Sequence, residues 1–224
     1  MILESRAVPP FMKNGFVVAC ERTREATVID PGDEVDQLLE LVRQLDVQVQ
    51  HILLTHAHVD HITGVAAAKA ALDVPVYLHE ADLFLYERAE EQGRMFGLPV
   101  SPQPPIDVFY DLTPLHFGDY EVRVFHTPGH CPGGACLEVV LRSAGGDPAA
   151  ERHLFVGDTL FAGSIGRTDL PGGDYDVLMR SITGVIFPLG DAAIVHPGHG
   201  PDTTVARERA SNPFVREYLG SGGR

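Results

Sequence analysis

The chain has 224 residues, 44% of them hydrophobic and 21% charged, a balance typical of a globular protein with a sizeable core. Its formal net charge of −14 excludes the basic face that nucleic-acid-binding proteins need, so we expect no nucleic-acid partner. No apolar stretch approaches the length of a membrane span, and residues 1–15 lack the regions of a signal peptide, so we expect no membrane partner either.

The N-terminal part of the sequence predicts strands and then alternating helices and strands. Residues 16–21 and 26–30 are apolar, β-branched runs separated by a charged turn, which is typical of two paired strands. Residues 33–45 carry apolar side chains at the spacing of an amphipathic helix face. Residues 49–56 predict a short buried strand, and the Ala-rich segment from Asp60 to about Leu72 predicts a helix.

The remaining elements follow the same signals. Strands are expected at 74–79, 121–130, 135–142, 153–161 and 192–200, and helices at 80–93, 175–186 and near 204–210. Residues 97–108 are rich in proline, so we expect an exposed loop there, and residues 94–107 are a candidate lid over a pocket.

This distribution of elements indicates the fold class. Two stretches of strands, each with flanking helices, predict an α/β protein in which two sheets pack face to face and helices cover both outer faces, a four-layer αββα sandwich. We expect a single domain over residues 1–219 and a flexible tail over residues 220–224.

Metal-capable side chains are concentrated in the segment Thr-His-Ala-His-Val-Asp-His at 55–61. His56 and His58 are two residues apart, so in an extended segment both project to the same side. Asp60 alone would be an ordinary N-cap of the next helix, but capping does not explain three histidines and a carboxylate within six residues. Neutral imidazoles and carboxylates are zinc ligands, so the segment predicts one part of a metal site.

Partners for this segment occur farther along the chain. His130, Asp158 and His199 each follow a predicted strand and lie beside glycines, where a rigid scaffold presents functional side chains. With the first group they make five histidines and two aspartates, enough to bind two metals that share one carboxylate. We expect two divalent ions, with Zn²⁺ favoured, although these side chains also accept iron or manganese.

Several stretches resemble one known family. The segment THAHVDH, the later lone histidine, the Gly-Asp strand end and the segment HPGHGP are similar to the metallo-β-lactamase superfamily, which has the αββα fold. LFAGSIGRTDLPGGD and HPGHGPDTTVARERASNPF resemble its short bacterial glyoxalase II (hydroxyacylglutathione hydrolase)-like branch. The resemblance implies a first metal on His56, His58 and His130, a second on Asp60, His61 and His199, and a bridge by Asp158.

The resemblance also implies an activity. A metal-bridging water, oriented by Asp60, would hydrolyse an S-acyl thioester such as S-lactoylglutathione, so the expected partner is a small, glutathione-derived thioester. Only 25 residues follow His199, so we expect a form without the C-terminal helical domain that binds glutathione in longer relatives. Arg167 is a candidate substrate-binding residue, the alternative being an ordinary solvated arginine.

Other activities stay open at this point. A persulfide dioxygenase with one iron and a lactonase share parts of the motif, whereas Asp158 stands where classical lactamases have cysteine or serine, which disfavours a penicillin substrate. The remaining histidines lack ligand spacing and are expected to be structural or exposed, although His79 and His196 end strands and could orient a ligand. The three cysteines form no C-x-x-C pair, so we expect no disulfide and a cytoplasmic location.

Overall fold

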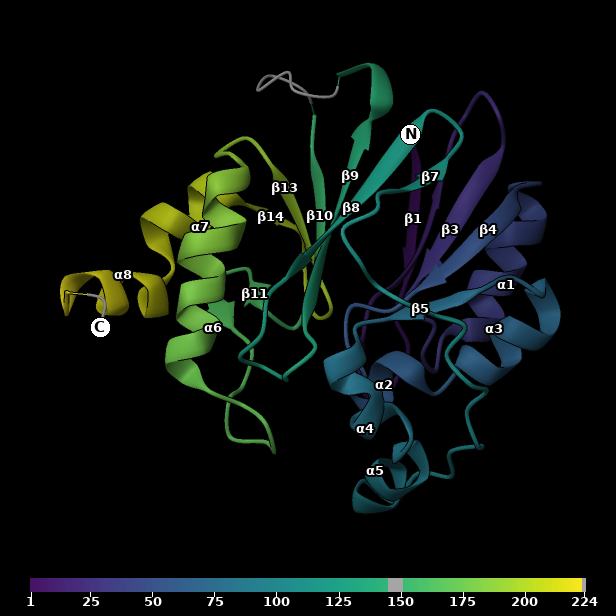
Figure 1. The fold of residues 1–224 in the computed structure, drawn as a ribbon, viewed down its shortest axis with the longest axis horizontal. Helices are drawn as coiled ribbons and strands as arrows, with labels where there is room; N and C mark the ends of the chain where they lie inside the picture. The colour runs from purple at the N-terminus through teal and green to yellow at the C-terminus, as the bar shows by residue number, and fades with distance from the viewer. Residues whose placement is uncertain (145–150, 223–224) are drawn as a thin grey trace.

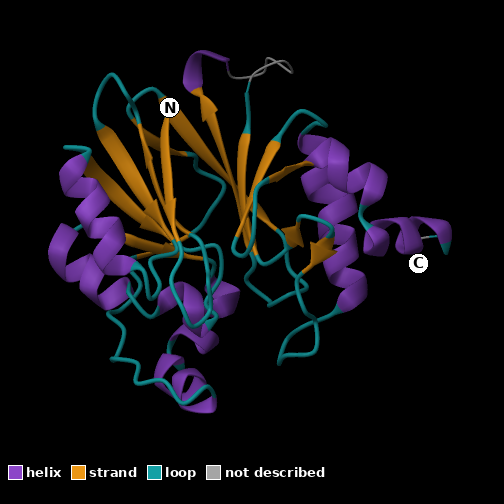
Figure 2. Ribbon diagram, turned by 180° about the vertical axis from the view of Figure 1, so that it is seen from behind, coloured by secondary structure: helices purple, strands orange, loops and turns teal. Residues whose placement is uncertain are grey.

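Two six-stranded sheets pack face to face, and helices cover the outer face of each (Figures 1 and 2). The computed structural model describes residues 1–144 and 151–222. The first sheet has the order β1-β2-β3-β4-β5-β6, antiparallel from β1 to β3 and parallel from β3 to β6. Its strands are β1 (Ile2–Arg6), β2 (Gly15–Ala19), β3 (Glu25–Ile29), β4 (Gln48–Leu53), β5 (Val76–Leu78) and β6 (Val108–Phe109).

The second sheet has the order β14-β13-β10-β9-β8-β7, and only its β10–β13 pair is parallel. Its strands are β7 (Leu115–Phe117), β8 (Tyr120–His126), β9 (Ala135–Leu141), β10 (His153–Gly157), β13 (Ile194–Pro197) and β14 (Thr203–Thr204). A short hairpin of β11 (Leu160–Phe161) and β12 (Ser164–Ile165) lies beside it. The four-layer αββα fold expected from the sequence is therefore confirmed.

The helices fall into three groups (Figure 1). The first sheet is covered by α1 (Val35–Gln44) and α3 (Val65–Leu72), and the second by α6 (Tyr175–Ser181), α7 (Val205–Ser211) and α8 (Pro213–Gly220). The lower end of the sandwich carries α2 (Val59–Ile62), α4 (Leu83–Tyr86) and α5 (Ala89–Met95). Short 3-10 or π turns complete the set at Glu80–Asp82, Arg142–Ala144, Ile182–Ile186 and Phe187–Leu189.

Strand β2 shows why its sequence is an unbroken apolar run. Phe16 and Val18 pack into the core between the two sheets, whereas Val17 and Ala19 pack against α1 on the other face. Both faces of the strand are buried, so the alternation of polar and apolar residues seen in half-exposed strands is absent. The core thus extends through three of the four layers at this point.

Two predicted helices are wrong in their extent. The helix expected from Asp60 to about Leu72 is interrupted at Thr63 and Gly64, which separate α2 from α3. The helix expected at 80–93 is a 3-10 turn followed by α4 and α5, with a turn at Glu87 and Arg88. In both cases the helix-forming residues favour one continuous helix, and tertiary contacts decide where the backbone bends.

The ends of the chain add elements that the sequence did not suggest. Strand β1 pairs with β2 at one edge, and helix α8 follows α7 on the outer face of the second sheet. The expected tail at 220–224 starts where α8 ends, although residues 223–224 lie outside the described part, and the 1–219 domain boundary stays a prediction. Within residues 1–144 and 151–222, no helix has the length and apolar character needed to cross a bilayer.

Candidate metal centre

All seven predicted ligands meet at the end of the sandwich beside α2. The segment between β4 and α2 and the first turns of α2 carry four of them, and the loops that follow β8, β10 and β13 carry the others. The ligand atoms form overlapping groups whose members lie within 4.8 Å of one another: His56, His58 and His130; His56, His61 and Asp158; and Asp60, His61 and His199. The groups share residues, which is the arrangement expected of two adjacent metal sites.

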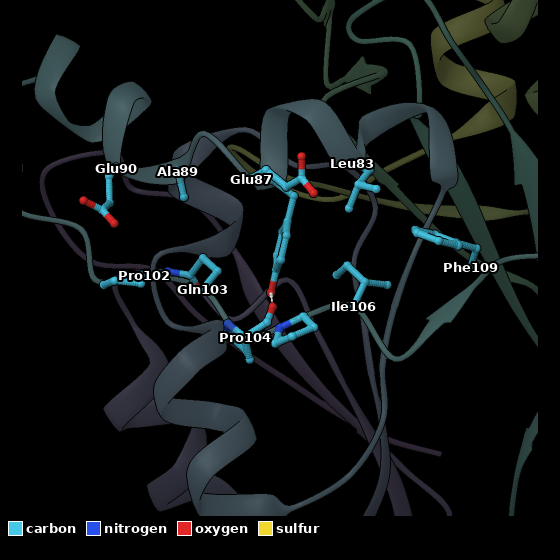
Figure 3. Close-up of a pocket in the computed structure, with 11 residues that line it drawn as sticks. Leu83, Glu87, Ala89, Glu90, Pro102, Gln103, Pro104, Ile106 and Phe109 are labelled. Carbon is cyan, nitrogen blue, oxygen red and sulfur yellow. Dashed lines mark hydrogen bonds between the residues drawn. The ribbon is translucent and has the colours of Figure 1, made fainter.

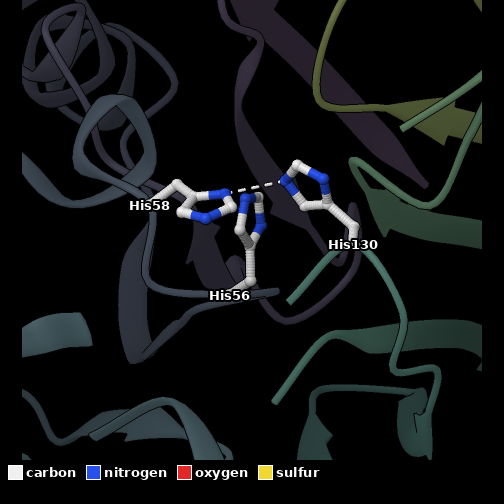
Figure 4. A group of neighbouring side chains, drawn as sticks. All are labelled: His56, His58 and His130. Atoms are coloured by element: carbon white, nitrogen blue, oxygen red, sulfur yellow. Dashed lines mark hydrogen bonds between the residues drawn. The ribbon is translucent and has the colours of Figure 1, made fainter. Parts of the chain in front are cut away.

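The first group consists of three buried histidines (Figure 4). Nδ1 of His58 lies 2.7 Å from Nε2 of His130, and the ring of His56 lies 4.9 Å from that of His58 and 5.0 Å from that of His130. His58 has extended backbone angles, so His56 and His58 project to the same side of the segment, as their spacing predicted.

Asp158 connects this group to the second one. In the second group, Nε2 of His199 lies 3.0 Å from Oδ2 of Asp60, and Nε2 of His61 lies 3.8 Å from the same oxygen. Oδ1 of Asp158 is 3.4 Å from Nε2 of His61, and its Oδ2 is 3.8 Å from Nε2 of His130. The carboxylate thus faces ligands of both groups, which suits a bridging role.

Buried polar atoms without partners show that this donor set fits a metal. Nε2 of His56, Nε2 of His61 and Oδ1 of Asp158 are inaccessible to solvent and make no hydrogen bond. Buried polar atoms are almost always paired, and exceptions call for an explanation such as an unseen ion. The three atoms point into the shared centre, so a cation there satisfies all of them at once.

Asp30 and Thr55, which the sequence did not reveal, set the orientation of two ligands. The Asp30 carboxylate accepts hydrogen bonds from the Thr55 amide at 2.7 Å, from the Thr55 hydroxyl at 2.6 Å and from Nδ1 of His61 at 2.9 Å. The Thr55 hydroxyl therefore accepts from Nδ1 of His56, 3.1 Å away. Both imidazoles carry their proton on Nδ1 and leave Nε2 free for a metal.

His130 is oriented in the same way by a backbone group. Its Nδ1 lies 2.7 Å from the carbonyl oxygen of Arg167, and because a carbonyl only accepts, this nitrogen carries the proton. Nε2 of His130 is then unprotonated and available to a metal.

The pKa values describe a centre with excess negative charge. Burial and then the neighbouring His130 lower the pKa of His58 to about 3, which keeps it a neutral ligand. Burial also acts to lower the pKa of His61, but the carboxylates of Asp60, Asp30 and Asp158 outweigh it and raise the pKa to about 10. The carboxylates thus favour a positive charge at this point, which a metal cation supplies.

The N-terminal segment positions the loop that carries His199. The Asn14 amide donates to the carbonyl of Gly198 at 2.7 Å, and its side chain donates to the carbonyls of Pro197 and Gly200 at 3.0 and 2.8 Å. A Cβ on Gly198 would lie 2.2 Å from Oδ1 of Asp158, so only glycine lets this loop approach the centre. Asn14 and Gly198 are more than 180 positions apart in the chain, and no sequence motif predicts their contact.

The other predicted site residues lie differently. The Arg167 side chain is exposed and pairs with Asp169 at 2.7 and 2.8 Å, so its contact with the centre is made by its backbone. His79 and His196 do not orient a ligand: His79 stacks on His126 at 4.0 Å, and His196 stacks on His153 at 5.2 Å.

A cavity of about 320 Å³ opens over the centre, and His58, Asp60, His130, Asp158 and His199 form its floor. Its walls come from α4 and α5, from Phe11 and from the segment between Arg167 and Pro171. Met95 and Phe96, in the expected lid at 94–107, line this cavity, whereas residues 102–106 line a second cavity on the other side of α4 and α5 (Figure 3). Of residues 94–107, Met95 and Phe96 thus line the cavity over the centre, and a lid role for this segment stays a prediction.

Comparison with known proteins identifies the family and the fold. The family model described as the metallo-beta-lactamase superfamily matches residues 8–199. Hydroxyacylglutathione hydrolase GloC of Haemophilus influenzae is 34% identical, over 96% of this chain and 98% of its own. Two solved structures are similar: BLEG-1 B3 metallo-beta-lactamase, with TM-score 0.84 and 35% identity over 96% of this chain and 99% of its own, and TTHA1623 in a di-iron-bound form, with TM-score 0.81 and 38% identity over 94% and 99%.

Proposed function

The chain belongs to the metallo-beta-lactamase superfamily, and on that premise we propose that this metallohydrolase cleaves S-acyl thioesters at a binuclear metal centre. His56, His58 and His130 would hold one metal ion, Asp60, His61 and His199 the other, and Asp158 would bridge the two. Bound metal ions acidify water to a pKa near 7 and polarise a substrate carbonyl. Zn²⁺ is our first choice of metal, and the di-iron form of a relative makes iron the second.

The residues of the chain supply position and charge. Oδ2 of Asp60, at the floor of the cavity, would accept a hydrogen bond from the attacking water and fix its direction toward the substrate carbonyl. Asp30 fixes the ring orientation of His61 directly and that of His56 through the Thr55 hydroxyl, so that Nε2 of both rings faces the centre. Partial enclosure by α4 and α5 strengthens each of these interactions by excluding water.

The observation that carries the thioester proposal is the absence of a general acid. Outside the predicted ligands, the ionisable side chains that line the described cavity are Arg88, Glu91 and Arg167. The two arginines cannot act as general acids near neutral pH, and Glu91 stands on the α5 wall and not on the floor of the cavity. A thiolate leaves without the help of a general acid, so a thioester is the substrate that this cavity suits, and the name of the 34% identical relative supports a glutathione thioester.

Metal content and S-lactoylglutathione hydrolysis measured on the same purified protein test the proposal. We expect two metal ions per chain and thioester cleavage that a chelator abolishes. Asp158→Ala is expected to lower kcat/KM by at least about a hundredfold, because it removes the link between the two sites. Full activity of metal-depleted protein would overturn the proposal.

Two further substrates separate the alternatives. Hydrolysis of a β-lactam is the second candidate, because a structure similar at 35% identity is named a B3 metallo-beta-lactamase. Oxygen uptake with glutathione persulfide, at one iron per chain, would instead indicate a dioxygenase. We expect neither rate to approach that of the thioester. A β-lactam has an amine leaving group, which needs a proton donor, and a single-iron site would leave Asp60, His61 and His199 without a metal.

A further inference from the structure

Helices α4 and α5 form a wall between two cavities. Phe84 of α4, Arg88 in the turn between the helices, and Glu91 and Met95 of α5 all line the cavity over the metal centre, and together they define the cavity-facing side of the two helices. Leu83, Glu87, Ala89 and Glu90, on the other face, line the second cavity against the proline-rich segment (Figure 3). The cavity-facing side is therefore positioned to contact a substrate bound over the metal centre.

This face exposes large apolar side chains. Phe84 is 39% exposed, Met95 is 74% exposed and Phe96, the next residue, is 52% exposed. Phe11 meets Phe96 edge to face at 5.6 Å and closes one side of the cavity. Exposed apolar groups gathered at a cavity mark a binding surface. A lactoyl group has one methyl and one hydroxyl, so it leaves most of this surface uncovered.

The same face carries two opposite charges without partners. Within the described part of the chain, the side chains of Arg88 and Glu91 make neither an ion pair nor a hydrogen bond, although both line the cavity. The other arginine at the cavity, Arg167, is already neutralised by Asp169. An unpaired guanidinium and an unpaired carboxylate one turn apart complement the carboxylate and ammonium of an amino acid. They do not complement a polyanion, because Glu91 repels it.

We propose that this face of α4 and α5 is the substrate-recognition surface, and that it selects thioesters with an apolar acyl group larger than lactoyl on a thiol with a zwitterionic, amino-acid end. Phe84, Met95 and Phe96 contact the acyl group, Arg88 binds the carboxylate of the thiol component and Glu91 binds its ammonium group. The proposal rests on the thioester activity inferred above and adds its substrate class. Glutathione meets the requirement for the thiol, and coenzyme A, with its phosphates, does not.

Binding of S-alkylglutathiones tests the surface without any hydrolysis, because a thioether cannot be cleaved. Burying one methylene is worth about 0.8 kcal/mol, or about fourfold in affinity. We expect calorimetry to show that S-hexylglutathione binds at least about tenfold more tightly than S-methylglutathione. Equal affinities would overturn the proposal even if S-lactoylglutathione is hydrolysed. A third outcome separates the two proposals. If affinity rises with alkyl chain length but no acylglutathione is cleaved, the recognition surface is supported and the proposed thioesterase activity is contradicted.

Matched variants assign the effect to the face. Phe84→Ser and Met95→Ser together should remove most of the preference for the hexyl group. Leu112→Ser should not, because this side chain is 98% exposed and lies outside both cavities.

Arg88→Gln and Glu91→Gln should each raise KM for hexanoylglutathione about tenfold with little change in kcat. Arg180→Gln, an exposed arginine of α6 outside the cavity, is the control. Faster cleavage of hexanoyl-coenzyme A than of hexanoylglutathione would overturn the assignment of the two charges.

Discussion

Asp82 is a fully buried carboxylate that joins the two loops carrying the first group of ligands. One oxygen accepts hydrogen bonds from the amide of Ala57, between His56 and His58, at 3.0 Å and from the Cys131 thiol at 3.1 Å. The other accepts from the amide of Gly133, close after His130, at 2.5 Å. Burial, and then the charge of Asp82, raises the pKa of the Cys131 thiol well above its usual value, so it stays a donor.

Asp82→Asn is therefore expected to loosen both ligand loops. The amide nitrogen cannot accept, so at least one buried donor is left unpaired, at a cost of about 1–3 kcal/mol in the free energy of unfolding. Metal affinity should fall about 10- to 100-fold, as for other residues that support ligands. Asp107→Asn removes a carboxylate contact with Lys69 and the Val76 amide far from the centre, and should lower stability without changing metal affinity. Equal metal affinity in the two variants would contradict the role given to Asp82.

His153 stacks on His196, and their rings are parallel within 6°. Nδ1 of His153 lies 2.9 Å from Nε2 of His196. Burial, and then His196, lowers the pKa of His153 in spite of the opposing charge of Glu151. The unfolded chain thus binds a proton at His153 more readily than the folded chain does. The free energy of unfolding is therefore highest above the unfolded pKa of about 6.5, where His153 is neutral in both states. It falls as the pH drops below that value, because protonation then favours the unfolded chain. Urea denaturation of the metal-free protein between about pH 5 and 8 should show a smaller pH dependence in His153→Asn than in the parent. Identical slopes would contradict the prediction.

The clustering of the candidate ligands could be predicted from the sequence because imidazoles and carboxylates stand at the ends of predicted strands, where few structural roles explain them. Asp30, Thr55 and Asp82 could not, because a lone aspartate or threonine after a strand is most often a cap or turn residue. Their role depends on which loops meet in space. The same limit applies to the Arg167 carbonyl, whose contact with His130 no sequence pattern indicates, while substrate binding by the Arg167 side chain stays a prediction.

At the scale of elements, the break between α2 and α3 shows how packing overrides helical periodicity. The amide of Gly64 donates to the carbonyl of Pro31 at 3.1 Å, in the loop that follows β3. A Cβ on Gly64 would lie 2.3 Å from the carbonyl oxygen of Gly32 and 2.5 Å from Cβ of Val35. The start of α3 is thus pressed against the backbone beside α1, a contact that no local pattern in the sequence indicates.

Gly64→Ala should therefore destabilise the protein, and because Gly64 is the N-cap of α3, the helix propensity of alanine does not offset the loss. The close contacts are with backbone and Cβ atoms that cannot move aside, and such overpacking costs about 1–3 kcal/mol. Gly184→Ala is the matched control, since a Cβ at Gly184 meets nothing within 4 Å and should be neutral or stabilising. The difference between the midpoints of thermal unfolding of the two variants measures the effect. A raised midpoint in Gly64→Ala would contradict the prediction, because it would show that the backbone at Gly32 and Val35 moves to make room for the methyl group.

At the scale of the whole molecule, the candidate metal centre lies at one end of two sheets that share a core between them. The αββα layering could be predicted because strand-rich and helical stretches alternate in both halves of the chain. The strand order could not, because partners such as β10 and β13 are brought together by packing over long separations. His56, His58, Asp60 and His61 follow the first sheet, whereas His130, Asp158 and His199 follow strands of the second. Metal ions bound there would connect the halves.

Removal of the metal should therefore weaken the entire fold rather than the loops alone. A ligand that binds only the native state at about a thousand times its Kd adds about 4 kcal/mol, and for a chain of this size that shifts the midpoint of thermal unfolding by about 10 °C. A chelator should lower the midpoint by that amount in one cooperative transition, and added Zn²⁺ should restore it. His199→Ala, which removes a ligand contributed by the second sheet, should show a smaller response to the chelator, whereas Leu112→Ser should respond like the parent. If metal loss, verified by elemental analysis, left the midpoint unchanged, the seven side chains would not be linking the two sheets through a metal ion.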